Sequence, residues 1–146
     1  MKKYETRGVI MDNFKFTYEE KNFELKEDNC EYINNEELES FDISTVLDIL
    51  CKSEDVDFER EYYDSCCDQC RGNRKDDTKF FQFLEYHFYI FTKDGKYVLS
   101  SISKEYETTT YTALMKEKKI DNSYIVSVLV CNNCETWAVE IEQCEM

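Results

Sequence analysis

Two Cys-x-x-Cys pairs are the residues of this sequence whose types and spacing are best suited to chemistry. One pair is Cys67 and Cys70, and the other is Cys131 and Cys134. Together they supply four thiolates, the full tetrahedral ligand set of a structural zinc ion. A two-residue spacer lets both sulfur atoms of a turn point to the same side. The sequence therefore predicts one structural Zn²⁺ per chain, held by these four cysteines.

For a shared metal site, the fold must bring together two cysteine pairs that are far apart in the sequence. Sixty residues lie between Cys70 and Cys131, whereas many zinc sites place their pairs only about 15–20 residues apart. Strands and a helix must therefore bring the two turns together. A second question concerns Cys66, which directly precedes Cys67 and can pair with Cys70 in its place. The sequence leaves the choice between these two ligands open, although the two-residue spacer is the commoner geometry.

Cysteines also occur in proteins without any metal. Cytosolic cysteine is often a small buried hydrophobic residue, and this is our expectation for Cys30, Cys51 and Cys144. The two pairs could also be plain thiols, or a redox disulfide. In a thioredoxin-like protein, the redox disulfide is formed by one Cys-x-x-Cys motif at the start of a helix. Neither pair precedes a helical pattern, so redox catalysis is disfavoured.

Catalytic residues of other kinds are not recognisable. His87 is the only histidine and lies within an apolar run, where we expect a hydrogen-bonded core or edge residue rather than a base or ligand. The three glycines are scattered, so there is no glycine-rich phosphate loop. The sequence predicts that the protein is not an enzyme.

Composition limits the partners. The 146 residues carry a net charge of −14, from 18 Lys+Arg against 32 Asp+Glu, and such a surface repels the phosphates of nucleic acids. No apolar run is long enough to span a membrane, and the lysine-rich start leads into no signal peptide. We expect a cytoplasmic protein with no nucleic-acid or membrane partner. No linker or repeat divides the chain, so residues 1–146 are expected to form a single domain.

The first half of the chain shows the periods of a hairpin, a helix and a strand. Apolar residues alternate over Phe14–Leu25, as in a β-hairpin. Helical spacing follows from Ile43 to Leu50, with Asp42 placed to cap the start. A short turn of helix is expected over Glu36–Glu39. Alternation resumes over Val56–Tyr62 and leads to the first cysteine pair.

The second half reads mainly as strands. In Phe80–Phe91 both the odd- and the even-numbered positions are largely apolar, so we expect a strand that is covered on both faces. The Asp-Gly turn in Lys93–Lys96 predicts a hairpin to a strand at Tyr97–Ser103. A short helix is expected at Thr110–Lys119 and two final strands at Tyr124–Val130 and Glu135–Glu142, with the second cysteine pair between them. The fold class is therefore α+β, a mostly antiparallel sheet with two or three short helices and a zinc-knuckle pair.

The Asn34–Glu39 segment, the apolar helix after it and the two distant cysteine pairs resemble a small bacterial family of unknown function, seen in clostridia-like anaerobes. The cysteine pairs also look like the knuckles of zinc ribbons. The chain departs from a typical ribbon in its sixty-residue separation and in lacking glycine directly after the second cysteine of each pair. The resemblance implies no activity.

The leading functional hypothesis is a non-enzymatic, zinc-stabilised acidic protein that serves as a protein-interaction module, with a partner that the sequence does not identify. The alternative is a thiolate-based redox or metal sensor, in which oxidation releases the zinc. A third hypothesis, that the protein is an acidic decoy that mimics nucleic acid, rests on net charge alone and ranks last.

Overall fold

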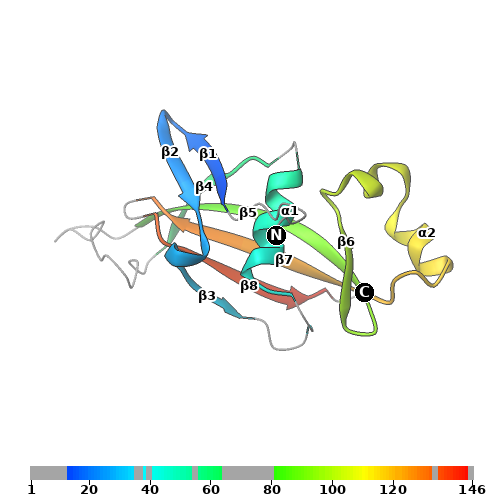
Figure 1. Cartoon of the computed structure of the whole chain (residues 1–146). Helices are drawn as coiled ribbons and strands as arrows, with labels where there is room; N and C mark the ends of the chain where they lie inside the picture. The colour runs from blue at the N-terminus through cyan, green and yellow to red at the C-terminus, as the bar shows by residue number, and fades with distance from the viewer. Residues whose placement is uncertain are drawn as a thin grey trace, which may run out of the picture.

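A six-stranded sheet is the centre of the fold. The computed structural model describes residues 13–34, 38, 41–53, 56–63, 81–132 and 135–144. Five strands lie in the order β3-β8-β7-β5-β4, and β6 pairs with β5 (Figure 1). All pairs are antiparallel except β3 with β8, so the predicted α+β class with a mostly antiparallel sheet is confirmed. The bounds are β3 Cys30–Asn34, β4 Glu59–Tyr63, β5 Phe81–Lys93, β6 Lys96–Ser100, β7 Asn122–Cys131 and β8 Trp137–Gln143.

The predicted N-terminal hairpin forms a separate two-stranded sheet. It consists of β1 (Phe14–Tyr18) and β2 (Lys21–Leu25). Glu19 and Glu20 form the turn, with φ of 48° and 69°. Two central residues with positive φ match the twist of the flanking strands.

The two α-helices begin where the sequence predicts. In α1 (Ile43–Lys52), the Asp42 carboxylate accepts a hydrogen bond from the Thr45 amide at 3.0 Å and satisfies a backbone donor of the first turn. In α2 (Tyr111–Lys116), Thr110 caps the start. This helix is shorter than predicted. The helical turn expected over Glu36–Glu39 falls, apart from Leu38, outside the described residues. Two 3₁₀ turns, η1 (Glu27–Asn29) and η2 (Lys104–Thr108), were not predicted.

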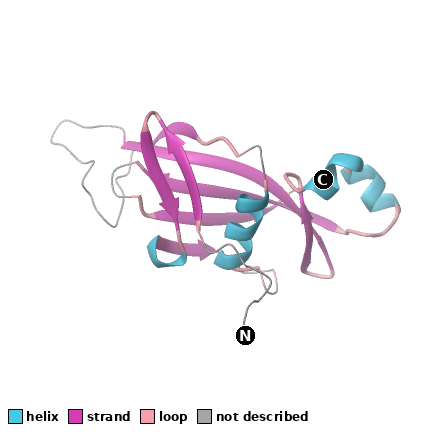
Figure 2. Cartoon of the chain, turned by 45° about the horizontal axis from the view of Figure 1, so that its top comes forward, coloured by secondary structure: helices cyan, strands magenta, loops and turns pink. Residues whose placement is uncertain are grey.

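The main core lies on one face of the sheet, beneath α1 and the β1–β2 hairpin (Figure 2). Alternate residues of β5 and β7 point into it and are almost fully buried, and they meet the apolar side of α1. Burying each such side chain contributes about 1.5–3 kcal/mol. The sheet residues at its centre are Leu84, Phe88, Ile90, Val126, Val128 and Val130.

A second, smaller cluster lies where β6 and α2 meet the far end of β5. It contains Phe91, Leu99, Leu114 and Ile120. Figure 1 shows α2 and β6 together at this end, away from the β1–β2 hairpin.

Three sequence predictions need correction. β5 is not covered on both faces, because His87 and Tyr89 are exposed in its middle. On the side of β5 to which these two residues point, Phe91 is buried and belongs to the second cluster. β6 ends at Ser100 because a hydrogen-bonded turn to Ser103 follows it. β4 begins only at Glu59.

Candidate metal centre

The structure describes one of the four predicted zinc ligands. Cys131 is the last residue of β7 and is 1% exposed. Cys67, Cys70 and Cys134, together with the alternative ligand Cys66, lie outside the described residues. Among those that are described, no three His, Cys, Asp or Glu side chains gather as a metal site would require. The four-cysteine site therefore stays a prediction.

The sheet does fix where the two cysteine-bearing segments begin. Cys131 lies opposite Phe83 of β5, and Phe83 lies opposite Glu61 of β4. These three residues form one row across three neighbouring strands. Two positions further along, β4 ends at Tyr63 and β5 begins opposite it at Phe81. The last described residue before the first cysteine pair and the first described residue after it therefore lie at the end of the sheet where Cys131 lies.

The distances along this row are short enough for a shared site. Neighbouring strands lie about 4.8 Å apart, so β4 and β7 are separated by about 10 Å across β5. The four residues from Tyr63 to Cys67 span at most about 14 Å when extended. The sixty-residue separation in sequence is therefore no obstacle, because β5 pairs with both β4 and β7.

The turn between β7 and β8 is closed by its own backbone. The Cys131 amide donates to the Thr136 carbonyl at 2.9 Å, and the Glu135 amide donates to the Cys131 carbonyl at 3.0 Å. Glu135 adopts φ of 66°, the left-handed conformation that favours glycine. The chain lacks glycine after Cys134, and Glu135 adopts the conformation that a glycine would otherwise provide.

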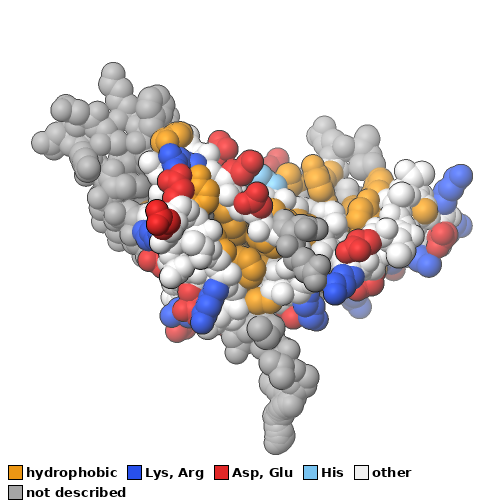
Figure 3. Space-filling view, turned by 90° about the horizontal axis from the view of Figure 1, so that it is seen from above, with side chains coloured by type: hydrophobic (Ala, Val, Ile, Leu, Met, Phe, Trp, Pro, Cys, Tyr) orange, Lys and Arg blue, Asp and Glu red, His pale blue; other side chains and the backbone are white. Residues whose placement is uncertain are grey.

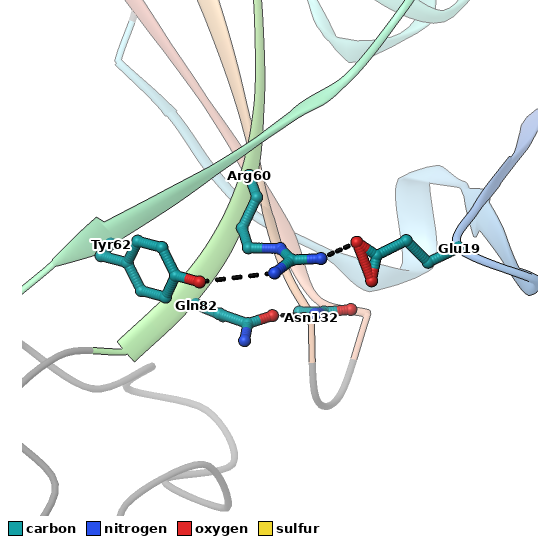
Figure 4. Close-up of polar contacts among 5 residues, drawn as sticks. All are labelled: Glu19, Arg60, Tyr62, Gln82 and Asn132. Carbon is teal, nitrogen blue, oxygen red and sulfur yellow. Dashed lines mark hydrogen bonds and ion pairs between the residues drawn. The ribbon is translucent and has the colours of Figure 1, made fainter.

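Side chains from three other elements hold the same turn. The Asn132 side chain donates from Nδ2 to Gln82 Oε1 of β5 at 2.6 Å. The backbone carbonyl of Asn132 accepts from Lys21 Nζ of β2 at 2.5 Å. Asn29 of η1 donates to the Glu135 carbonyl at 3.2 Å. Figure 4 shows Asn132 beside Gln82. Asn132, within the second cysteine pair, and Glu135, directly after it, are thus fixed relative to β2, β5 and η1.

The β1–β2 turn is attached to the same end of the sheet. Arg60 of β4 forms an ion pair with Glu19 of the turn (Figure 4). Its guanidinium carbon also lies over the Tyr18 ring, 5.7 Å from the ring centroid. The Arg60 guanidinium also donates to the Tyr62 hydroxyl at 3.4 Å. These contacts link β4 to the hairpin directly before residues 64–80.

The remaining described cysteines are Cys30, Cys51 and Cys144. All three are partly exposed, which corrects the expectation that they are buried. Burial nonetheless raises the pKa of the Cys30 thiol to about 11, helped by Glu31 and Glu27 and opposed by a hydrogen bond to the Tyr32 backbone. Burial and Asp48 raise the pKa of Cys51. Both thiols stay protonated at neutral pH and react slowly.

The sequence analysis missed a hydrogen-bonded chain around His87. Its Nδ1 lies 2.8 Å from the Ser127 hydroxyl, and its Nε2 lies 2.9 Å from Glu85 Oε1. Ser127 is opposite His87 in the β5–β7 pair. Glu85, two residues before His87, points to the same face. The prediction that His87 is hydrogen-bonded is confirmed, but the ring is 47% exposed on an open sheet face.

A Ser–His–Glu chain needs further parts before it can catalyse acyl transfer. It requires free backbone or side-chain donors for an oxyanion and a pocket for the substrate. β7 lies between β5 and β8, so its amides near Ser127 belong to the sheet ladder. Two surface depressions, one beside Cys30 and one between α1 and η2, are lined by other residues. The described part of the chain therefore places no recognisable catalytic site at His87.

Comparison with known proteins identifies a family but no activity. A family model described as "Protein of unknown function (DUF3785)" matches residues 14–146. The chain belongs to this family. No curated protein and no solved structure matches it. Within the described residues, no helix combines the length and apolar character needed to cross a membrane.

Proposed function

We propose that this member of the family is a non-enzymatic protein-interaction module, stabilised by one Zn²⁺ bound to Cys67, Cys70, Cys131 and Cys134. The observation that carries the proposal is the row from Glu61 through Phe83 to Cys131. It puts the end of β4, the start of β5 and Cys131 at one end of the sheet, which supports a shared site. The likeness to zinc-ribbon knuckles and to bacterial relatives belongs to the same proposal, as does a cytoplasmic location, where reducing conditions keep thiols available for metal.

Four cysteine ligands suit a structural role. A catalytic zinc keeps a position open for water, whereas four thiolates close the shell and lower the Lewis acidity of the ion. Here the metal would fasten the β4–β5 connection to the β7–β8 turn. The residues beside Cys131 are already held through Asn132 and Glu135, which supports a structural role for the metal at this turn.

The alternative function is a redox or metal sensor. Oxidants react with thiolates that solvent reaches. Cys131 is 1% exposed, which limits access to this position and favours the structural role. Zinc that is released by mild peroxide and rebound after reduction would favour the sensor instead.

Elemental analysis of protein purified under reducing conditions without chelator tests the proposal. We expect one zinc per chain. Cys67→Ser and Cys131→Ser should lower the zinc content, whereas Cys51→Ser is the matched control and should retain it. Cys66→Ser decides between the two neighbouring ligands. Metal-free wild-type protein, or equal zinc loss in the Cys51 variant, would overturn the proposal.

A further inference from the structure

The sheet face opposite α1 and the β1–β2 hairpin carries exposed side chains between its Cys131 end and Phe91, where the second cluster covers it. The strand register places its side chains in four rows across β4, β5, β7, β8 and β3. The rows are Glu61–Phe83–Cys131, Glu59–Glu85–Leu129–Ala138–Tyr32, His87–Ser127–Glu140–Asn34 and Tyr89–Ile125–Glu142. We call these four rows the open face.

The open face is acidic. Five carboxylates lie on it, and its described rows contain no lysine or arginine. His87 is the only group there that can carry positive charge. Figure 3 shows the histidine among acidic side chains, with hydrophobic side chains close by. The carboxylates are Glu59, Glu61, Glu85, Glu140 and Glu142.

Apolar surface lies between these charges. Tyr32 and Tyr89 are 42% and 46% exposed, and Leu129 and Ile125 are half-buried. The Tyr32 hydroxyl donates to Glu140 Oε2 at 2.7 Å, which holds both side chains in place. A surface with fixed aromatic rings and charges loses little side-chain entropy on binding.

Within the described rows of the open face, His87 is the one basic residue among five carboxylates. The Glu85 side chain is 10% exposed, and its ionic partner is His87. Burial raises the pKa of the Glu85 carboxyl; His87 opposes this, and Glu61 and Glu140 add to it. An added cation would relieve the repulsion among these carboxylates.

We infer that the open face docks a cationic protein segment in which arginine or lysine alternates with apolar residues. This rests on the proposed function, because it names the partner class of the interaction module. The basic groups meet the carboxylates, and the apolar side chains cover Leu129 and Tyr89. A second copy of this acidic chain would meet like charge, which costs binding energy.

Peptide binding measured by fluorescence anisotropy at about 150 mM salt, where long-range charge effects are largely screened, tests the inference. The probes are four labelled seven-residue peptides that alternate arginine with leucine, arginine with serine, serine with leucine, and glutamate with leucine. We expect the arginine–leucine peptide to bind at least fivefold more tightly than the arginine–serine and serine–leucine peptides. The glutamate–leucine peptide should not bind.

Two double variants of equal charge separate a local site from the overall field. Glu61→Gln with Glu140→Gln changes the open face, and Glu107→Gln with Glu117→Gln changes exposed residues in and beside η2 and α2. The first pair should weaken arginine–leucine binding at least fivefold, and the second less than twofold. Circular dichroism confirms that both variants are folded.

Three outcomes would overturn the inference: no saturable binding below about 1 mM, equal weakening by both double variants, or concentration-dependent self-association that the Glu61 and Glu140 changes abolish. Zinc is measured in the same samples. Binding without zinc would refute the metal centre and leave the docking face standing, whereas zinc without binding would do the reverse.

Discussion

The two faces of the central sheet are built from the same strands and have opposite chemistry. Along β7, Val126, Val128 and Val130 are fully buried beneath α1 and the hairpin. Between them, Ser127 and Leu129 point to the open face beside His87 and Glu85. The core face supplies the main hydrophobic core, whereas the exposed charged and aromatic residues of the open face lie outside it. This difference supports our proposal that the open face docks a partner.

The largest expected effect is a loss of stability confined to the core face. Leu84→Ala should cost about 2–5 kcal/mol, because Leu84 is fully buried in the main cluster. Leu129→Ala is the matched control on the open face and should cost less than about 1.5 kcal/mol. Denaturant unfolding measures both values. Similar losses would show that the two faces do not differ as described.

Removal of metal should affect one end of the sheet and spare the core. If free zinc exceeds its dissociation constant 100- to 1,000-fold, binding adds about 2.7–4.1 kcal/mol of stability. Chelation should therefore lower the melting temperature while far-UV circular dichroism at 25 °C is largely retained. Cys131→Ser should show no further drop with chelator. Complete unfolding on chelation would mean that the core face is insufficient for folding.

The pH dependence of stability should reveal the buried charge on the open face. The pKa of Glu85 is raised in the folded state by burial, with His87, Glu61 and Glu140 facing it. As pH rises above about 4.5, the unfolded carboxyl loses its proton first, so this group destabilises the fold increasingly until the folded pKa is passed. Glu85→Gln should remove that loss.

The measurement is the difference in free energy of unfolding between Glu85→Gln and wild type, from pH 4 to pH 6. It should grow with pH in favour of the variant. The exposed Glu142 provides the control, and Glu142→Gln should show a smaller change. A difference that grows in favour of wild type would contradict the assignment.

The smallest expected effect concerns the turn after β7. Glu135 has φ of 66°, a conformation that costs an L-residue about 1–2 kcal/mol. Glycine removes this strain but gains entropy in the unfolded chain, so Glu135→Gly should stabilise by about 0.5 kcal/mol. Glu140→Gly, within β8, should destabilise. Thermal unfolding compares the two variants. A loss of stability in both would show that the Glu135 backbone is not strained.

Local features of the fold were predictable because local patterns encode them. Asp42 before an apolar helical face, the alternation of Phe14–Leu25 and the Asp94-Gly95 turn all appear in the structure as predicted. β3 was missed because it is short and pairs in parallel with β8, more than a hundred residues later. Nothing in its local sequence indicates that partner.

The same limit applies to the candidate sites. The sequence placed Cys131 at a turn between two strands, and the structure confirms this. It did not show that β5 pairs with both β4 and β7, which puts the end of β4 and the start of β5 at the end of the sheet where Cys131 lies. Nor did it reveal that Ser127 faces His87, since strand register sets that contact across forty residues.

X-ray absorption spectroscopy at the zinc edge tests the central claim most directly. The account predicts a fully occupied site with four sulfur scatterers at about 2.3 Å and no nitrogen or oxygen ligand. Cys67→Ser or Cys131→Ser should lower the sulfur coordination number or abolish binding. Protein without zinc, or zinc bound mainly by nitrogen and oxygen at about 2.0–2.1 Å, would contradict the four-cysteine centre.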